Sequence, residues 1–139
     1  MSEVKQFIYF LKKIKLETLP FSSGKIKLNE EGLLEFSTNK KIVISEFGMY
    51  NIDIGLRLRL KKKILNPLNY CLFISNHLES EIYKKGIYIP EFIIGLPNNK
   101  WVDIVLPFVN PIGKQLILPS GGLICKAILQ TYNYPKIKN

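Results

Sequence analysis

The sequence is poor in the residues on which most catalytic and metal-binding sites depend. Its 139 residues include one histidine, two aspartates and two cysteines: His77, Asp53, Asp103, Cys71 and Cys125. The cysteines form no CxxC pair and lie in apolar runs, where a free thiol usually acts as a small hydrophobic side chain. A single disulfide between them stays an open alternative. Because no GxxxxGK or GxGxxG motif is present either, we expect a protein that is not an enzyme and uses no metal or other cofactor.

The few polar candidates leave two enzymatic alternatives open. His77 stands in the segment SNHLES with Glu79 and Glu81 close by, a combination that a weak metal site could use. Asp53 and Asp103 lie on the polar faces of predicted strands, and glycoside hydrolysis needs a pair of carboxylates. We favour the simpler interpretation, that these side chains face solvent or form ion pairs.

Long hydrophobic segments are also missing. No run of 18 or more apolar residues occurs, so the sequence predicts no membrane span. The apolar stretch at residues 7–11 is too short for a signal peptide, and no small-residue cleavage site follows it. A hydrophobic share of 47% and a mean hydropathy of +0.08 nevertheless predict a globular chain. At 139 residues, that chain is expected to form one domain.

Acidic residues are scarce relative to basic ones, which gives a net charge of +9. This charge favours contact with polyanions, because phosphate neutralisation drives nucleic-acid binding. However, Arg57 and Arg59 are the only arginines, and arginine is the residue best suited to bidentate phosphate contacts. Solubility and the codon usage of an AT-rich genome are the favoured explanation of the many lysines. Nucleic-acid contact therefore stays one alternative.

What the sequence does contain is a repeated strand pattern. From Tyr50 to Leu60 every even position is apolar or aromatic, which predicts a long strand with Ile52 to Leu60 as its core row. Gly48 marks a bend or bulge at its start. Other alternating or apolar segments lie before and after it, separated by turns such as NEEG, NPLN, PNNK, NPIG and PSGG, and the two segments joined by NEEG are expected to form a hairpin. About eight such strands predict an all-β fold, a sandwich, barrel or jelly roll, formed as one domain over residues 20–139.

Three segments depart from the plain strand pattern. Residues 4–16 have apolar positions near a 3.6-residue period but many β-forming side chains, so residues 1–19 are expected to form an arm with a short amphipathic helix or strand. The polar segment at residues 76–86 is expected to be a loop, with a short helix as the alternative. Pro90 interrupts the next apolar segment, which favours an edge strand or an irregular connection over a central strand.

Two groups of side chains are candidates for contact with other molecules. The first is a basic cluster at the end of the long strand, predicted to contact anions or a partner: Arg57, Arg59, Lys61, Lys62 and Lys63. The alternative is a solvent-exposed strand end whose lysines discourage edge-to-edge aggregation. The second group consists of aromatics near strand ends, predicted to serve an interface or bind a ligand: Tyr88, Phe92, Trp101, Tyr132 and Tyr134.

Several segments resemble the tumour-necrosis-factor and complement-head superfamily. Gly48 and Tyr50 match its glycine-x-tyrosine entrance to a long strand, and YCLFISNHLES resembles the next strand and its polar hairpin. VNPIGKQLILP is similar to a turn-glycine-strand segment, with Lys114 where an acidic residue is common. GGLICKAILQTY resembles the C-terminal strand near the trimer axis.

This resemblance implies an all-β antiparallel jelly-roll sandwich of about eight to ten strands that forms a homotrimer, binds receptors or glycans and performs no chemistry. Together with the sparse catalytic residues, it leads us to expect a structural or assembly protein of a virus or phage particle, such as a capsid, fibre or decoration protein. Its partners would be further copies of itself and other particle proteins. Its location would be the virion, or the cytoplasm if the protein is not viral. The alternatives are a lectin-like glycan- or receptor-binding head and a basic coat protein that contacts nucleic acid.

Overall fold

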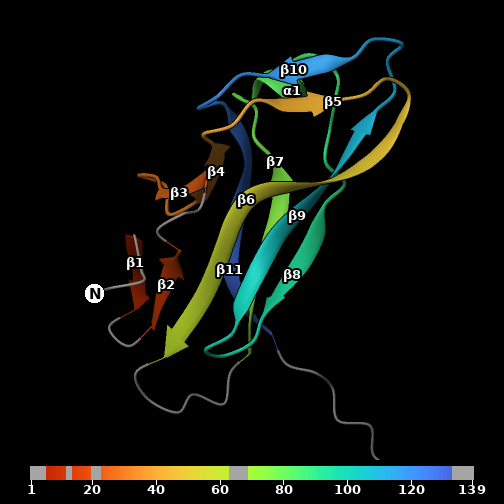
Figure 1. Cartoon of the computed structure of the whole chain (residues 1–139). Helices are drawn as coiled ribbons and strands as arrows, with labels where there is room; N and C mark the ends of the chain where they lie inside the picture. The colour runs from red at the N-terminus through yellow and green to blue at the C-terminus, as the bar shows by residue number, and fades with distance from the viewer. Residues whose placement is uncertain (1–5, 12–13, 20–22, 63–68, 133–139) are drawn as a thin grey trace, which may run out of the picture.

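The computed structural model describes residues 6–11, 14–19, 23–62 and 69–132. Within these ranges lie eleven strands and one short helix, α1 (Glu81–Lys84), and the paired strands are antiparallel (Figure 1). The predicted all-β class is confirmed, with slightly more strands than the sequence predicted. The alternative of a short helix in the polar segment at residues 76–86 is also confirmed. No helix in the described ranges is long and apolar enough to cross a membrane.

One sheet has four strands in the order β1-β2-β6-β9: β1 (Gln6–Leu11), β2 (Ile14–Thr18), β6 (Gly48–Lys62) and β9 (Trp101–Asn110). The first two strands form a hairpin, and β2 pairs with β6 from Ile14 opposite Lys62 to Thr18 opposite Leu58. The helix that the 3.6-residue spacing allowed is therefore wrong at the described positions, and the strand alternative is confirmed. The β-forming side chains outweigh the helical spacing because β6 offers this segment a ladder of backbone partners.

The other sheets contain the remaining strands. The five-stranded sheet has the order β3-β4-β11-β7-β8: β3 (Gly24–Leu28), β4 (Leu34–Thr38), β11 (Leu123–Tyr132), β7 (Asn69–Asn76) and β8 (Phe92–Leu96). A small sheet pairs β5 (Ile42–Ile44) with β10 (Leu116–Leu118). Strand β8 lies at a sheet edge and begins two residues after Pro90, which confirms the edge-strand prediction.

The four- and five-stranded sheets pack against each other in a sandwich-like arrangement. The predicted core row of β6 is confirmed: Ile54, Leu56, Leu58 and Leu60 are at most 1% exposed, and Ile52 packs against them from a partly buried position. The opposing sheet contributes buried side chains such as Phe36 and Leu72. Each fully buried side chain of this size contributes about 1.5–3 kcal/mol of hydrophobic free energy.

A bulge interrupts the long strand β6 at Gly55. Asp53 lies opposite Val105 and Arg57 opposite Asp103, so β6 spans this stretch with two more residues than β9 does. An insertion of two residues preserves the alternation of faces, whereas one extra residue would turn the following core row outward. Gly48, by contrast, pairs regularly with Asn110, and the chain bends just before it, at residues 46–47.

The two cysteines are free and buried. In the ladder between β7 and β11, Cys71 lies opposite Gln130 and Cys125 opposite Asn76, five residues further along β11. This separation of about 16 Å is far beyond the reach of a disulfide, and an odd spacing places the two side chains on opposite faces of the sheet. Burial raises the pKa of both thiols, so each is held in its neutral form.

Candidate interaction surface

The single histidine is part of a hydrogen-bonded loop, not of a cluster of metal ligands. His77 Nε2 lies 2.7 Å from Glu35 Oε2, and His77 Nδ1 accepts the backbone N–H of Glu79 at 3.0 Å. Because Nδ1 is an acceptor, the proton of the neutral ring is on Nε2 and is donated to the Glu35 carboxylate. The described residues contain no group of three or more histidine, cysteine, aspartate or glutamate side chains that could hold a metal ion.

Both aspartates have structural contacts. The Asp53 carboxylate accepts the backbone N–H of Gly55 at 2.8 Å, so it stabilises the bulge of β6. The Asp103 carboxylate lies 2.6 Å from Arg57 Nε, in a pair whose side chains are both half exposed. Neither carboxylate is therefore free of partners within the chain. Their contacts agree with the simpler interpretation of these residues.

The basic cluster at the end of β6 meets carboxylates from the two neighbouring strands. Arg59 donates to Glu17 Oε2 from Nε at 2.9 Å and from Nη2 at 2.6 Å. The Glu17 side chain is 1% exposed, and the guanidinium of Arg59 also lies over the Trp101 ring, 4.5 Å from its centroid. Glu17, Arg59 and Trp101 are direct cross-strand neighbours on β2, β6 and β9. The like charges that the sequence placed on this face are thus balanced in part by carboxylates of the chain itself.

The other members of the two predicted contact groups are more scattered. Lys61 is exposed, while the side chain of Lys62 and all of Lys63 lie outside the described residues. Tyr88 is 42% exposed, Phe92 packs partly buried against the core, and Trp101 is partly covered by Arg59. The side chain of Tyr132 and all of Tyr134 lie outside the described residues. Among the aromatics whose side chains the structure describes, Tyr88 bridges to Val109 near one end of β9 and Trp101 begins β9 at the other end, so these two do not share one surface.

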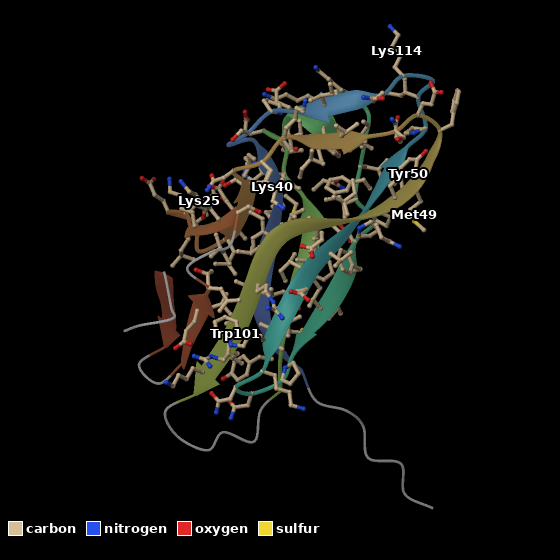
Figure 2. The ribbon with its side chains drawn as sticks, in the orientation of Figure 1. Lys25, Lys40, Met49, Tyr50, Trp101 and Lys114 are labelled. Carbon is tan, nitrogen blue, oxygen red and sulfur yellow. The ribbon has the colours of Figure 1, made fainter. Side chains whose placement is uncertain are left out.

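An exposed apolar surface lies at the opposite end of β6, and Tyr88 is the one member of it that the sequence analysis named as a candidate. We call it the apolar end; it consists of Phe47, Met49, Tyr88 and Ile112, which are 69%, 63%, 42% and 37% exposed. Met49 lies opposite Val109, which in turn bridges to Tyr88. The backbone N–H of Phe47 donates to the Ile112 carbonyl. Figure 2 shows Met49 at one end of the long strand and Trp101 at the other.

Side-chain hydrogen bonds to the backbone hold the apolar end in place. Asn110 is 0% exposed; its amide nitrogen donates to the carbonyls of Ser45 and Lys114, and its amide oxygen accepts the N–H of Ile112. The Tyr50 hydroxyl donates to the carbonyl of Glu46 at 2.5 Å. These bonds fix the two turns that carry Phe47 and Ile112, so the surface is formed before any partner arrives.

The signal for this surface was present in the alternation itself. Residues at odd positions of β6 face outward, and Met49 continues that odd row with an apolar side chain where charges stand further along. Phe47, also at an odd position, has a φ of 41°, in the left-handed region that large side chains rarely adopt. An apolar residue in the outward phase of a two-faced strand is the pattern that could have identified the surface.

An open pocket lies beside the apolar end. It has a volume of about 530 Å³ and is lined by Asn76, Tyr83, Gly86, Ile87 and Tyr88. Asn76 both donates to and accepts from the backbone of Ile89, which anchors the segment that carries Tyr88. Two tyrosines at the rim give the pocket apolar rings with polar tips.

The geometry therefore describes a rigid sandwich with internally paired charges at one end and exposed apolar side chains at the other. No protein-family model matches this chain, and no curated protein matches it either.

Proposed function

We propose that this protein is a non-enzymatic structural and assembly module, a jelly-roll component of a virus or phage particle that forms homotrimers and contacts other particle proteins. The observation that carries the proposal is the apolar end, where Phe47 and Met49 are each more than 60% exposed. Large exposed apolar side chains that are held rigidly cost free energy in water, and a partner surface removes that cost.

The composition of the surface supports a protein partner. Phenylalanine, tyrosine and methionine are enriched at the centres of interfaces, with charged residues at the rim. Exposed Lys85 and Lys114 flank Ile112 along a shallow depression, which is the arrangement of an apolar centre with a charged rim. A second copy of the chain is the simplest partner, since most soluble oligomers are symmetric assemblies of one chain.

The contacts of the polar residues support a role without chemistry. Asp53 stabilises a bulge, Asp103 pairs with Arg57, and His77 links Glu35 to the loop at Glu79. Each of these side chains has a local structural task that explains its presence.

A glycan-binding head is the second candidate, and one observation favours it. Tyr83 and Tyr88 line the open pocket beside the apolar end, and their rings could stack on the apolar face of a sugar. A coat protein that contacts nucleic acid ranks below both, because the guanidinium groups of Arg57 and Arg59 already have carboxylate partners.

Analytical ultracentrifugation of the wild-type chain at low and moderate salt tests the proposal, with Met49→Lys as the disrupting variant. We expect a trimer, or a multiple of three, that Met49→Lys weakens about tenfold or more, because an unpaired ammonium would be buried in the contact. Leu78→Lys is the matched control, since Leu78 is 67% exposed and lies outside the apolar end.

The same experiment separates the candidates. A wild-type monomer at both salt concentrations, or a trimer that Met49→Lys leaves intact, would reject the apolar end as the assembly surface. A large species that forms only when nucleic acid is added would favour the coat protein instead.

A further inference from the structure

The two edges of the five-stranded sheet are protected very differently. Strand β3, at one edge, carries the exposed lysines Lys25 and Lys27, which discourage pairing with another strand. Strand β8, at the other edge, has the sequence FIIGL and no charged residue. On its far side no strand of the described chain pairs with it. An uncharged edge with open backbone groups is a template for strand addition.

The outward face of β8 is apolar as well. Ile93 is 60% exposed and lies opposite Phe73 on β7, which lies opposite Ile128 on β11. Ile128 is 37% exposed, so an apolar row runs from the middle of the sheet to the edge at β8. The row ends where a further strand would extend it.

We propose that β8 pairs antiparallel with β8 of a second copy, joining two five-stranded sheets into one continuous sheet. Full overlap of Phe92–Leu96 puts Ile94 on the two-fold axis and Ile93 opposite Gly95 of the second copy. This register keeps outward residues opposite outward residues, as strand pleating requires. Because Gly95 has no side chain, the second copy leaves room for each Ile93 to cover the joint.

The charges around β8 select the antiparallel orientation. Glu91 precedes the strand, and Lys100 follows it in the turn that leads to β9. Antiparallel pairing places Glu91 of each copy beside the turn that carries Lys100 of the other, whereas parallel pairing would bring like charges together. This complementarity at both ends makes the edge self-complementary.

A second copy fits this edge better than other pairings do. Each chain carries a net charge of +9, so two copies approach at the lowest electrostatic cost where the contact has no charge of its own. Pairing β8 with β3 of another copy would bring Lys25 and Lys27 into the joint and would propagate into an open fibre. A two-fold joint instead uses both β8 edges, and the joined ten-stranded sheet then ends at β3 on each side, where the lysines stand.

The joint is distinct from the apolar end, so its test does not depend on the proposed trimer. Ile93→Lys adds two cations at the two-fold joint while leaving the core untouched. We expect the wild-type assembly to have at least twice the mass of the Ile93→Lys assembly in ultracentrifugation: hexamer against trimer, or dimer against monomer if the proposed trimer fails. Ile117→Lys is the matched control, because Ile117 is a 48% exposed isoleucine on β10.

Charge reversal provides the sharper measurement. Glu91→Lys and Lys100→Glu are each expected to weaken the pairing severalfold, and the double variant is expected to restore it. Equal masses for wild type and Ile93→Lys, a matching drop in Ile117→Lys, or a double variant no better than the single ones would overturn the proposal. Far-ultraviolet circular dichroism of every variant ensures that the comparison is made between folded proteins.

Discussion

The side chains at the two ends of the outward face of β6 have opposite surroundings: at one end they are paired within the chain, and at the other they are exposed. Toward Lys62, Arg57 and Arg59 find carboxylates on the neighbouring strands, and Glu17 is buried beneath Arg59. Toward Gly48, Phe47 and Met49 stand well exposed beside turns that hydrogen bonds hold rigid.

The difference teaches that residue type alone does not identify the contact surface of this strand. The charged end resembles a contact surface in the sequence, yet its best-placed cations are engaged within the chain. The apolar end resembles part of the core, yet it faces water. A surface whose side chains already have partners within the chain is a poorer candidate for binding than a surface whose apolar side chains are exposed.

The bulge at Gly55 separates the two ends. Substitution of Gly55 is expected to have the largest effect on stability. Gly55 has a φ of +76°, and an added Cβ would lie 1.7 Å from Ser23 Oγ. Gly55→Ala combines a left-handed backbone with a steric clash, so we expect it to lower the free energy of unfolding by about 4 kcal/mol. Urea denaturation followed by circular dichroism measures this loss.

Gly121→Ala is the matched control for that variant. Gly121 has a similar φ of +82°, but an added Cβ there would meet no atom within 4 Å. It should lose only the backbone part, about 1–2 kcal/mol. The double variant Ser23→Gly/Gly55→Ala should recover much of the difference. If Gly55→Ala costs no more than Gly121→Ala, close packing of Ser23 on the bulge is not what maintains the register.

The sequence predicted the regular parts of the fold well, because they follow from alternation. Each of three features follows from a short stretch of sequence: the core row of β6, the β3–β4 hairpin and the edge position of β8. The bulge was not predicted at Gly55, since a two-residue insertion keeps the alternation intact and leaves no trace in it. The choice between helix and strand for residues 4–16 depended on β6, about forty residues away.

The candidate surfaces were harder to predict, for a related reason. Arg59 and Glu17 are separated by 42 positions, and only the sheet order makes them neighbours. The residue types along β6 therefore indicated a row of charged side chains, but not the carboxylates that pair with them. The exposure of Phe47 likewise depends on Asn110, whose hydrogen bonds to Ser45 and Lys114 hold two distant turns together.

Asn110 provides the next test, because it holds the apolar end without contributing to its surface. Asn110→Ala would leave the carbonyls of Ser45 and Lys114 and the N–H of Ile112 without their buried partner. We expect a loss of about 3 kcal/mol in the free energy of unfolding and faster hydrogen exchange at the Ile112 amide. Asn98→Ala, at an exposed turn position, is the control. Unchanged exchange at Ile112 would show that the turn keeps its form without this side chain.

The smallest expected effects distinguish the two ion pairs at the charged end. A double-mutant cycle on Glu17→Gln and Arg59→Met should give a coupling of about 2 kcal/mol, since a carboxylate that is 1% exposed accepts two charge-assisted hydrogen bonds. The same cycle on Arg57→Met and Asp103→Asn should give about 0.2–1 kcal/mol, because both side chains are half exposed.

Salt sharpens that contrast, because screening acts on exposed charges more than on buried ones. Raising the salt concentration to about 1 M should erase most of the Arg57–Asp103 coupling and leave most of the Glu17–Arg59 coupling. Equal couplings that fade together would mean that Arg59 is as accessible to ions as Arg57 is. The charged end would then regain its place as a candidate surface for anionic partners, and the apolar end would no longer be the better candidate of the two.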